Sequence, residues 1–181
     1  MSSTAVLSSR YLFSKLENHY PALPACEGES PRMHEFILTL SDKDFESLEK
    51  AGIPKSQAIP QVGKLFLDFG FHAPTVAFPE VFGLMIEPTE SYGIAELDRF
   101  AEAVLAIKEI IEDHPEVLRS APHFTPIDRV DEVGANRNLC LRERLEHLPS
   151  LPFNRVKPSI LKDLSISEIK TRILEAAQTA G

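Results

Sequence analysis

The middle of the chain carries the clearest pattern of apolar and polar positions, and its period changes there from helical to extended. Val62, Leu65 and Phe69 recur at helical spacing, which predicts a helix over Ile59–Phe69. Gly70 follows at the position where helices commonly end in a left-handed residue. We therefore expect the helix to stop at this glycine.

Two short strands are predicted directly after that stop. Phe71–Phe78 is rich in Phe, Val and Thr, and Phe82–Glu87 reads FGLMIE. Only Pro79-Glu80-Val81 lies between them, which is too short for a crossover, so the pair should form an antiparallel hairpin. Pro74 and Pro79 cannot donate ladder hydrogen bonds, and they belong at a sheet edge or at strand ends.

A third strand and a short helix are predicted before the hairpin. His34–Leu40 is apolar on both faces, so we expect it to lie centrally in the sheet. Ser41 can cap a helix that runs to Lys50 and is stopped by Gly52. Pro54–Pro60 is interpreted as a linker turn.

The remaining elements are helices and one connector. Ser3–Tyr20 has a loose apolar stripe, and Ile94–Asp113 is the longest amphipathic helix. Asp128–Leu145 is helical in pattern but highly charged, which indicates a face toward solvent or a partner. Leu148–Pro158 is a Pro-rich connector, and Ser165-Ile166-Ser167-Glu168 is a capping box that opens a C-terminal helix.

These elements predict an α+β fold in two layers: a small, mainly antiparallel sheet with helices on one face. The chain has 181 residues, for which one core is the default. We interpret residues 1–145 as this domain with its N-terminal helix. Residues 146–181 would add the connector and the C-terminal helix as an extension.

Composition narrows the class of partners. The net charge is −8, which argues against a nucleic-acid surface and an anionic membrane surface. No apolar run approaches the ~20 residues that a membrane span needs, and the start of the chain lacks the pattern of a signal peptide. Cys26 and Cys140 are the only cysteines and are expected to be reduced thiols. The expected location is the cytoplasm.

Several short sequence words occur in a fixed order along the chain. They are GFHAPT (Gly70–Thr75), MIEPTES (Met85–Ser91), ELDRF (Glu96–Phe100), Ala121-Pro122-His123, Asp128–Val133 and Ala135-Asn136-Arg137-Asn138. In this order they resemble the C-terminal part of the P-protein of the glycine cleavage system, the pyridoxal-phosphate-dependent glycine decarboxylase. The last run is most similar to the two-subunit bacterial form. The resemblance covers Ser9 to Leu141.

The resemblance implies the architecture of the small C-terminal domain of fold-type I pyridoxal-phosphate enzymes and a role in glycine catabolism. In that family the cofactor lysine, the phosphate cradle and the acidic partner of the pyridine nitrogen lie in a preceding large domain. Every lysine here, Lys108 included, has the context of a surface residue, and the 8 glycines are scattered. We therefore expect no catalytic and no cofactor-binding residue in this chain. It should be inactive alone and should meet pyridoxal phosphate only in a complex with a large-domain partner.

The candidate residues for an active-site edge or a partner-facing surface lie in or near the matching words. They are His34, His72, Thr75, Glu87, Thr89 and Glu90. His72 either faces the domain cleft or hydrogen-bonds the chain at the helix–strand junction, and the junction role is the plainer one. Thr89 or Ser91 is expected to cap the following helix, with the nearby acids favoured by its positive end.

Two other kinds of site are not favoured by the sequence. His34 and Glu35 could form an acid–base pair, but neighbours in a strand point to opposite faces. The six histidines and two cysteines show no metal-ligand spacing, so no metal site is expected.

Two functional hypotheses follow. The first is a free-standing small-domain subunit or fragment of a glycine decarboxylase, which is completed by a separate cofactor-domain subunit and served by the lipoyl carrier protein. The second is a non-catalytic binding or regulatory protein that kept the fold and docks on the decarboxylase or its lipoyl carrier. Exposed apolar surface without the large domain would also favour a homo-oligomer, unless the terminal helices cover it.

Overall fold

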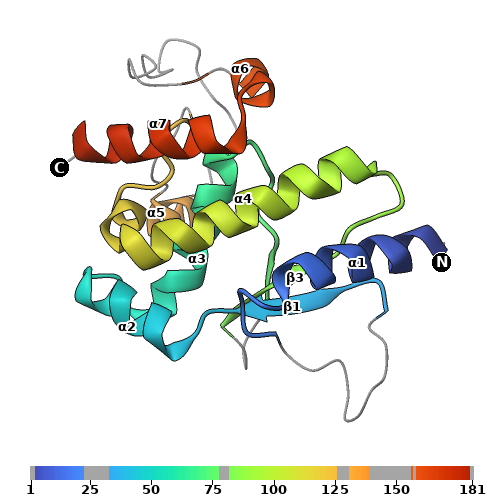
Figure 1. Ribbon diagram of the computed structural model, residues 1–181. Coiled ribbons are helices and arrows are strands. Elements are labelled where there is room, and N and C mark those ends of the chain that lie inside the picture. Colours follow the sequence, from blue (N-terminus) through green and yellow to red (C-terminus); the bar gives the residue numbers. More distant parts are fainter. Residues whose placement is uncertain are drawn as a thin grey trace.

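The computed structural model (Figure 1) describes residues 3–22, 33–77, 82–125, 131–138, 156 and 158–179. A three-stranded antiparallel sheet packs against a group of helices, which confirms the two-layer α+β class. Five predictions fall outside these ranges wholly or in large part: the Pro79-Glu80-Val81 turn, the state of the two cysteines, the charged helix over Asp128–Leu145, the Leu148–Pro158 connector and the boundary between residues 145 and 146. These stay predictions.

The sheet has the order β1-β3-β2, with β1 at Phe36–Thr39, β2 at Thr75–Ala77 and β3 at Gly83–Ile86. Both pairings are antiparallel, so the predicted hairpin of β2 and β3 is confirmed. The buried side chains of β1 and β3 face the helices together, because Phe36 lies opposite Ile86 and Leu38 lies opposite Leu84.

The prediction that the first strand lies centrally is wrong. β1 is an outer strand, and β3 lies in the centre. The chain just before it covers its free side: the Thr39 N–H donates to the Pro21 carbonyl at 2.9 Å, and Ala22 forms a bridge with Leu38. Such a cover satisfies backbone groups that an open edge would leave unpaired. Ile37, on the other face of β1, is only half-buried, so the apolar pattern on both faces did not mark a central strand.

Helix α4 (Ile94–Asp113) is the centre of the helical layer and has the predicted bounds. Figure 1 shows it running diagonally through the molecule. Five elements pack against it: α1 (Ser3–Leu16), α2 (Asp42–Lys50), α3 (Lys55–Asp68), the 3₁₀ helix η1 (Pro115–Arg119) and α7 (Ile166–Thr179). Its residues Ile107, Ile110 and Ile111 are fully buried at their meeting point.

Helix α3 begins earlier than predicted, so the linker turn over Pro54–Pro60 is wrong. Pro60 lies inside the helix, exposed to solvent, while Ala58 and Ile59 are buried. A proline inside a helix removes one backbone hydrogen bond. Burial of Ala58 and Ile59 offsets that loss. A prediction based only on helix-breaking residues in the sequence does not include this burial.

The two predicted glycine stops are confirmed. Gly70 has φ +81°, its N–H donates to the Leu67 carbonyl at 3.0 Å, and the next N–H, of Phe71, donates to the Phe66 carbonyl at 2.9 Å. Gly52 ends α2 in the same way with φ +86°. These paired bonds satisfy the last carbonyls of each helix, and the left-handed glycine makes them possible.

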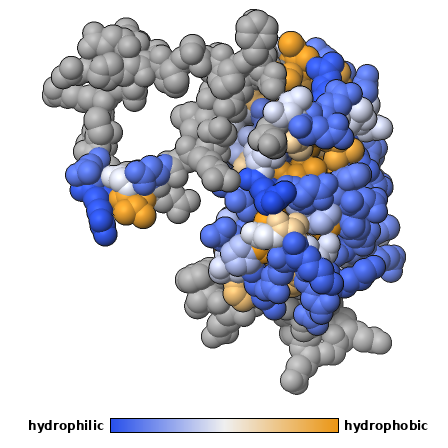
Figure 2. Space-filling model, turned by 90° about the vertical axis from the view of Figure 1, so that its left-hand side faces the viewer, coloured by the Kyte–Doolittle hydropathy of each residue, from blue (hydrophilic) through white to orange (hydrophobic). Residues whose placement is uncertain are grey.

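Within the described ranges, the C-terminal part adds three helices. They are α5 (Glu132–Arg137), α6 (Pro158–Asp163) and α7, and α7 begins at the predicted capping box, in which the Glu168 N–H donates to Ser165 Oγ at 3.2 Å. The face of the molecule shown in Figure 2 is mainly hydrophilic, with separate small apolar patches. No helix within the described ranges is long and apolar enough to cross a membrane.

Candidate functional site: a groove at the helix–hairpin junction

A groove of about 690 Å³ lies where the end of α3, the hairpin, the start of α4 and α6 meet. The chain turns sharply at Gly70, so the residues after it form one wall and the end of β3 forms the next. Its apolar lining comprises Leu12, Phe69, Phe71, Ala73, Pro74, Met85, Ile86, Pro88, Leu97, Phe100 and Leu161. Its polar lining comprises His72, Thr75, Glu87, Tyr92, Glu96, Arg99 and Lys162.

Three of the six candidate residues line this groove. His72 and Thr75 come from the segment after Gly70, and Glu87 follows the last residue of β3. Thr75 lies opposite Met85 in the β2–β3 register, so the two strands carry their residues to one place. The sequence therefore located one side of the groove, because these residues are close in the hairpin.

The exposed His72 ring also contacts its own chain. Its Nδ1 lies 2.9 Å from the Ala73 carbonyl oxygen. If Nδ1 carries the proton, it donates to that oxygen, and Nε2 is left as an acceptor. The junction interpretation thus has a contact to support it, and the same ring still lines the groove.

His34 pairs with Glu87, across the sheet. Its Nε2 lies 3.5 Å from Glu87 Oε1, and its buried Nδ1 has no hydrogen-bond partner within the described ranges. The ion pair requires a protonated imidazole. Sequence reasoning placed both residues on the candidate site but did not pair them, because their contact depends on β1 lying beside β3.

Thr89 and Glu90 lie outside the groove lining, exposed in the turn before α4. The expectation that Thr89 or Ser91 caps α4 is wrong, because the N-cap is Gly93. Thr89 Oγ1 instead accepts the Ser91 N–H at 3.3 Å within the turn. The Glu96 carboxylate, in the first turn of α4, accepts the Gly93 N–H at 2.9 Å and so satisfies the backbone donor of the N-cap residue.

Residues of α4 and α6 complete the groove, and sequence reasoning missed them. Tyr92, Glu96 and Arg99 come from the start of α4, and Lys162 comes from α6. Glu96 and Arg99 belong to the ELDRF word, which was the available signal. Arg99 Nη2 donates to the Leu161 carbonyl at 3.0 Å.

A buried polar cluster outside the groove joins the loop after η1 to the end of α3. Asp68 Oδ1 accepts the N–H groups of His123 and Phe124 at 2.7 and 2.8 Å. Asp68 Oδ2 lies 2.8 Å from His123 Nδ1, and Ser120 Oγ lies 3.0 Å from His123 Nε2. The carboxylate is fully buried and serves two backbone donors, so the cluster fixes the Ala121-Pro122-His123 loop. The sequence word marked this loop but gave no sign of its anchor.

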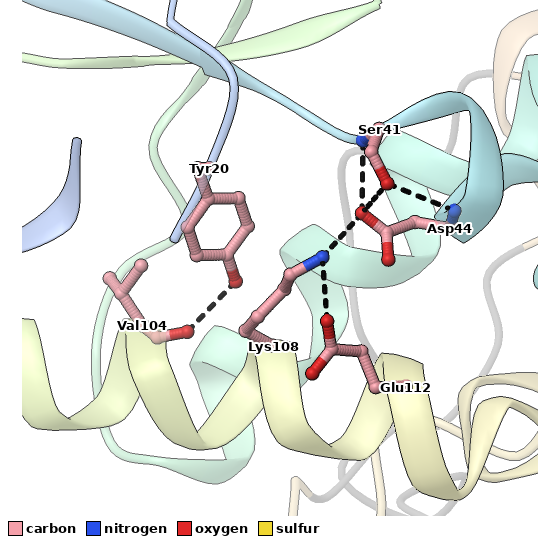
Figure 3. Close-up of polar contacts among 6 residues, drawn as sticks. All are labelled: Tyr20, Ser41, Asp44, Val104, Lys108 and Glu112. Atoms are coloured by element: carbon pink, nitrogen blue, oxygen red, sulfur yellow. Dashed lines mark hydrogen bonds and ion pairs between the residues drawn. The ribbon is translucent and has the colours of Figure 1, made fainter. Parts of the chain in front are cut away.

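The expectation that Lys108 is a surface residue is wrong. Figure 3 shows its ammonium between α2 and α4, where it donates to Asp44 at 2.5 Å and pairs with Glu112 at 3.2 Å. Asp44 is 2% exposed and also accepts hydrogen bonds from Ser41. Lys108 lies on the apolar stripe of α4. The buried Asp44 carboxylate of α2 offsets the free-energy cost of burying the Lys108 charge there.

The surroundings shift the pKa values of two groups in this network. Burial raises the pKa of Asp44, but the hydrogen bonds from Lys108 and Ser41 outweigh burial and hold it below its usual value. Burial, together with the charges of Asp44 and Glu112, raises the pKa of Tyr20 well above its usual value. The Tyr20 hydroxyl donates to the Val104 carbonyl at 2.8 Å (Figure 3).

Metal ligands do not gather within the described part of the chain. No group of three or more His, Cys, Asp or Glu side chains there has the arrangement to hold a metal ion.

Comparison with known proteins places these features in a family. The sequence model of the family "Glycine dehydrogenase, C-terminal domain" matches residues 1–123. The match includes the Gly70 stop, the hairpin and α4, and therefore most of the groove lining.

Individual relatives agree. A probable glycine dehydrogenase (decarboxylating) subunit 2 of Prosthecochloris aestuarii is 41% identical over 141 residues, covering 77% of this chain and 26% of the relative. The protein of that name from Aquifex aeolicus is 40% identical over 148 residues, covering 78% and 27%. A glycine dehydrogenase (decarboxylating) of Flavobacterium johnsoniae is 43% identical over 125 residues, covering 66% and 12%. This chain thus spans at most about a quarter of these relatives' length, and it belongs to the family of the glycine dehydrogenase C-terminal domain.

Proposed function

We propose that this chain supplies the small-domain wall of a glycine decarboxylase of the glycine cleavage system and has no decarboxylase activity alone. The observation that carries this proposal is the groove, in which His72, Thr75 and Glu87 gather within the family-matched region. Histidine and carboxylate groups at a cleft are suited to orienting a small zwitterionic substrate or exchanging protons with it. A second chain would have to provide the facing wall.

The residues of the groove do not fit pyridoxal phosphate. A phosphate group needs free backbone N–H groups or clustered donors, but at the start of α4 the groove is lined by the Glu96 carboxylate, which accepts the Gly93 N–H and would repel a phosphate. Arg99 already donates to the Leu161 carbonyl. Lys162 is the lysine of the groove lining and is exposed, whereas an aldehyde-binding lysine is normally desolvated or activated. These points support a cofactor held by the partner.

The proposed partners follow from this division of labour. A cofactor-bearing subunit would close the groove, and the lipoyl carrier protein would deliver its arm to the completed site. The relatives named as subunit 2 support the idea of a multi-subunit enzyme. We place the assembly in the cytoplasm.

The first experiment is an absorbance titration of the purified chain with pyridoxal phosphate, followed by borohydride reduction and peptide mapping. Surface lysines with ordinary basicity react weakly with the aldehyde, so we expect scattered, substoichiometric adducts and no exchange of carbon dioxide with the glycine carboxyl. The Lys162→Arg variant is the control for the groove lysine. A stoichiometric adduct on a single lysine would contradict the proposal and identify the binding residue.

The second experiment adds the missing part. The subunit 2 relative of Prosthecochloris aestuarii is prepared without its C-terminal quarter and mixed with this chain and with that organism's subunit 1. The mixture should regain cofactor absorbance and carbon dioxide exchange. His72→Ala should lower the exchange rate, while His19→Ala, at an exposed turn outside the groove lining, should not. Equal rates for both variants would leave His72 with the junction role alone.

The second candidate function is a non-catalytic docking protein. It is favoured by α6, which already covers one end of the groove with Leu161 and Lys162 and is bound there by Arg99. Under this alternative, the mixture would form a complex by size-exclusion chromatography but would gain no exchange activity. Recovery of activity would decide for the first candidate.

A further inference from the structure

Helix α6 packs against one end of the groove and is held there by the Leu161 side chain and the Leu161 carbonyl. Leu161 is 5% exposed, and its Cβ lies 3.8 Å from where a Cβ on Gly70 would be. Its carbonyl accepts the Arg99 guanidinium at 3.0 Å. The same carbonyl also accepts the Leu164 N–H at 3.4 Å, so Arg99 is its second and closer donor, and a cation at a helix C-terminus is favoured by the helix dipole. Arg99 therefore recognises the C-terminal turn of α6.

The attachment of α6 is much weaker than that of α7. Leu161 is the buried apolar side chain of α6, and Ile160 beside it is 45% exposed. In contrast, α7 buries Ile166, Ile169 and Ile173, and its Lys170 pairs with Glu109 of α4 at 2.5 Å. A helix of six residues is not stable by itself in water, so α6 depends on its two contacts with the groove and on the flanking Val156 and Leu164, which pack partly buried against the core.

The groove and its occupant differ in their relation to the family. The groove walls between Phe69 and Phe100 lie within the matched residues 1–123, whereas α6 and α7 lie beyond them. At one end of the groove, a surface within the family-matched region is thus covered, in this chain, by a segment outside that region. The end of the groove covered by α6 is apolar and contains Arg99, which donates a hydrogen bond to a helix carbonyl. The bound α6 thus indicates that this end can bind an apolar side chain together with a carbonyl group at the end of a helix.

We propose that α6 is a displaceable plug, and that the groove end beneath it is a docking site for a short amphipathic helix of another chain. Such a helix carries a leucine-sized anchor and presents a carbonyl of its last turn to Arg99. α7 stays bound to α4 during the exchange and keeps the plug near its site. The inference concerns binding at the groove and holds whether or not the chain takes part in decarboxylation.

A fluorescently labelled peptide of residues 158–165 tests this proposal. A tethered plug has an effective concentration on the order of mM, so the wild-type groove should resist the peptide. Leu161→Asp puts a charge at the anchor position and should release the plug. We expect fluorescence anisotropy to show binding at least about tenfold tighter to Leu161→Asp than to wild type. The matched variant Ile160→Asp, on the exposed face of the same helix, should behave as wild type.

Two further arms tie the binding to the two contacts. A peptide with Leu161→Ala should bind Leu161→Asp protein more weakly than the natural peptide does. Adding Arg99→Ala to the Leu161→Asp protein should also weaken the natural peptide. Circular dichroism confirms that each variant is folded, and Leu161→Ala replaces Leu161→Asp if the latter is not.

Hydrogen exchange on the wild-type chain gives an independent measure. The amides of 160–163 should exchange faster than those of 170–175, because the plug opens while α7 stays packed. Equal protection of the two helices, or equal peptide affinity for wild type and Leu161→Asp, would overturn the proposal. A wild-type dimer that exchanges α6 between copies, seen by size-exclusion chromatography, would overturn the intramolecular plug.

Discussion

At the scale of single residues, the Lys108–Asp44 ion pair joins α4 to the first turn of α2. The side chains are 11% and 3% exposed, so both charges have lost most of their water. Desolvation of this kind is offset only when each charge keeps good partners. Lys108 keeps two carboxylates, and Asp44 keeps the lysine and Ser41.

Lys108→Met should therefore lower the free energy of unfolding by about 3–5 kcal/mol, because it leaves the Asp44 carboxylate buried without its cation. Urea denaturation measures the change. Adding Asp44→Asn should recover part of the loss, since it removes the unpaired charge. Glu112→Gln, whose side chain is 48% exposed, is the control and should cost less than about 1 kcal/mol. A similar loss for Glu112→Gln and Lys108→Met would contradict the assignment of Asp44 as the main partner.

Tyr20 gives a second prediction, about alkaline pH. Its folded-state pKa lies well above 10.0, so the folded chain holds the phenol proton where the unfolded chain releases it. The stabilising contribution is complete below pH 10 and is lost as the pH rises through the folded-state pKa. The free energy of unfolding should fall more steeply above pH 10 in wild type than in Tyr20→Phe. Parallel pH profiles of the two proteins would contradict this prediction, because they would mean that folding does not change the pKa of the Tyr20 phenol.

At the scale of elements, the position of the groove depends on how α3 ends. Gly70 adopts φ +81°, and the chain leaves the helix there to form one groove wall. An added Cβ would meet only an ordinary contact at 3.8 Å from Leu161 Cβ, so the difficulty for another residue lies in the backbone conformation. Gly63 lies in the middle of the same helix, without a positive φ.

Gly70→Ala should thus destabilise the fold by roughly 1–2 kcal/mol, the cost of a left-handed conformation for an L-residue. Gly63→Ala is the matched control: an added Cβ would lie 3.6 Å from Ala73 Cβ, and the helix gains a better former. It should be neutral or stabilising. Thermal denaturation followed by circular dichroism compares the two. An unchanged melting temperature for Gly70→Ala would contradict the helix-stop role.

At the scale of the whole molecule, the two terminal helices cover opposite parts of α4. α1 is attached by the Tyr11 hydroxyl and Lys15, which contact Asp98 at 2.5 and 2.8 Å. α7 lies beside another part of α4 (Figure 1) and buries its three isoleucines. The alternative that the terminal helices cover the apolar surface thus has structural support, while the oligomeric state stays a prediction.

Deletion of residues 158–181 should make the chain self-associate. It exposes the surfaces of α4 and η1 that α7 covers, together with the groove end under Leu161. Apolar patches of this kind promote association in a small domain. Light scattering after size-exclusion chromatography should give a larger mass per particle for the deletion than for the full chain. A monodisperse, equally soluble monomer of the deleted chain would contradict this expectation.

The candidate site shows how far sequence reasoning reaches. His72, Thr75 and Glu87 were found because they belong to one hairpin and one set of sequence words, and hairpin pairing follows from a short connection. Thr89 and Glu90 were included by proximity along the chain, but the turn carries them outside the groove lining. Arg99 and Leu161 lie 62 residues apart, and no pattern within either helix indicates that they meet.

The sequence by itself determined the features that a few neighbouring residues control: the glycine stops, the cap at Ser41, the capping box at Ser165, the bounds of α4 and the hairpin. The hydrogen bonds of the stops and caps close within about five residues, and the hairpin pairs residues six to ten positions apart, from Ala77–Gly83 to Thr75–Met85, so local residue types suffice. Only the tertiary structure decided that β1 lies at an edge, that α3 continues through Pro60 and that Lys108 is buried. Each of these outcomes depends on residues far away in the sequence: those that pair with β1, those that bury the apolar face of α3, and Asp44, which pairs with Lys108. The free energy of that packing outweighs local preference.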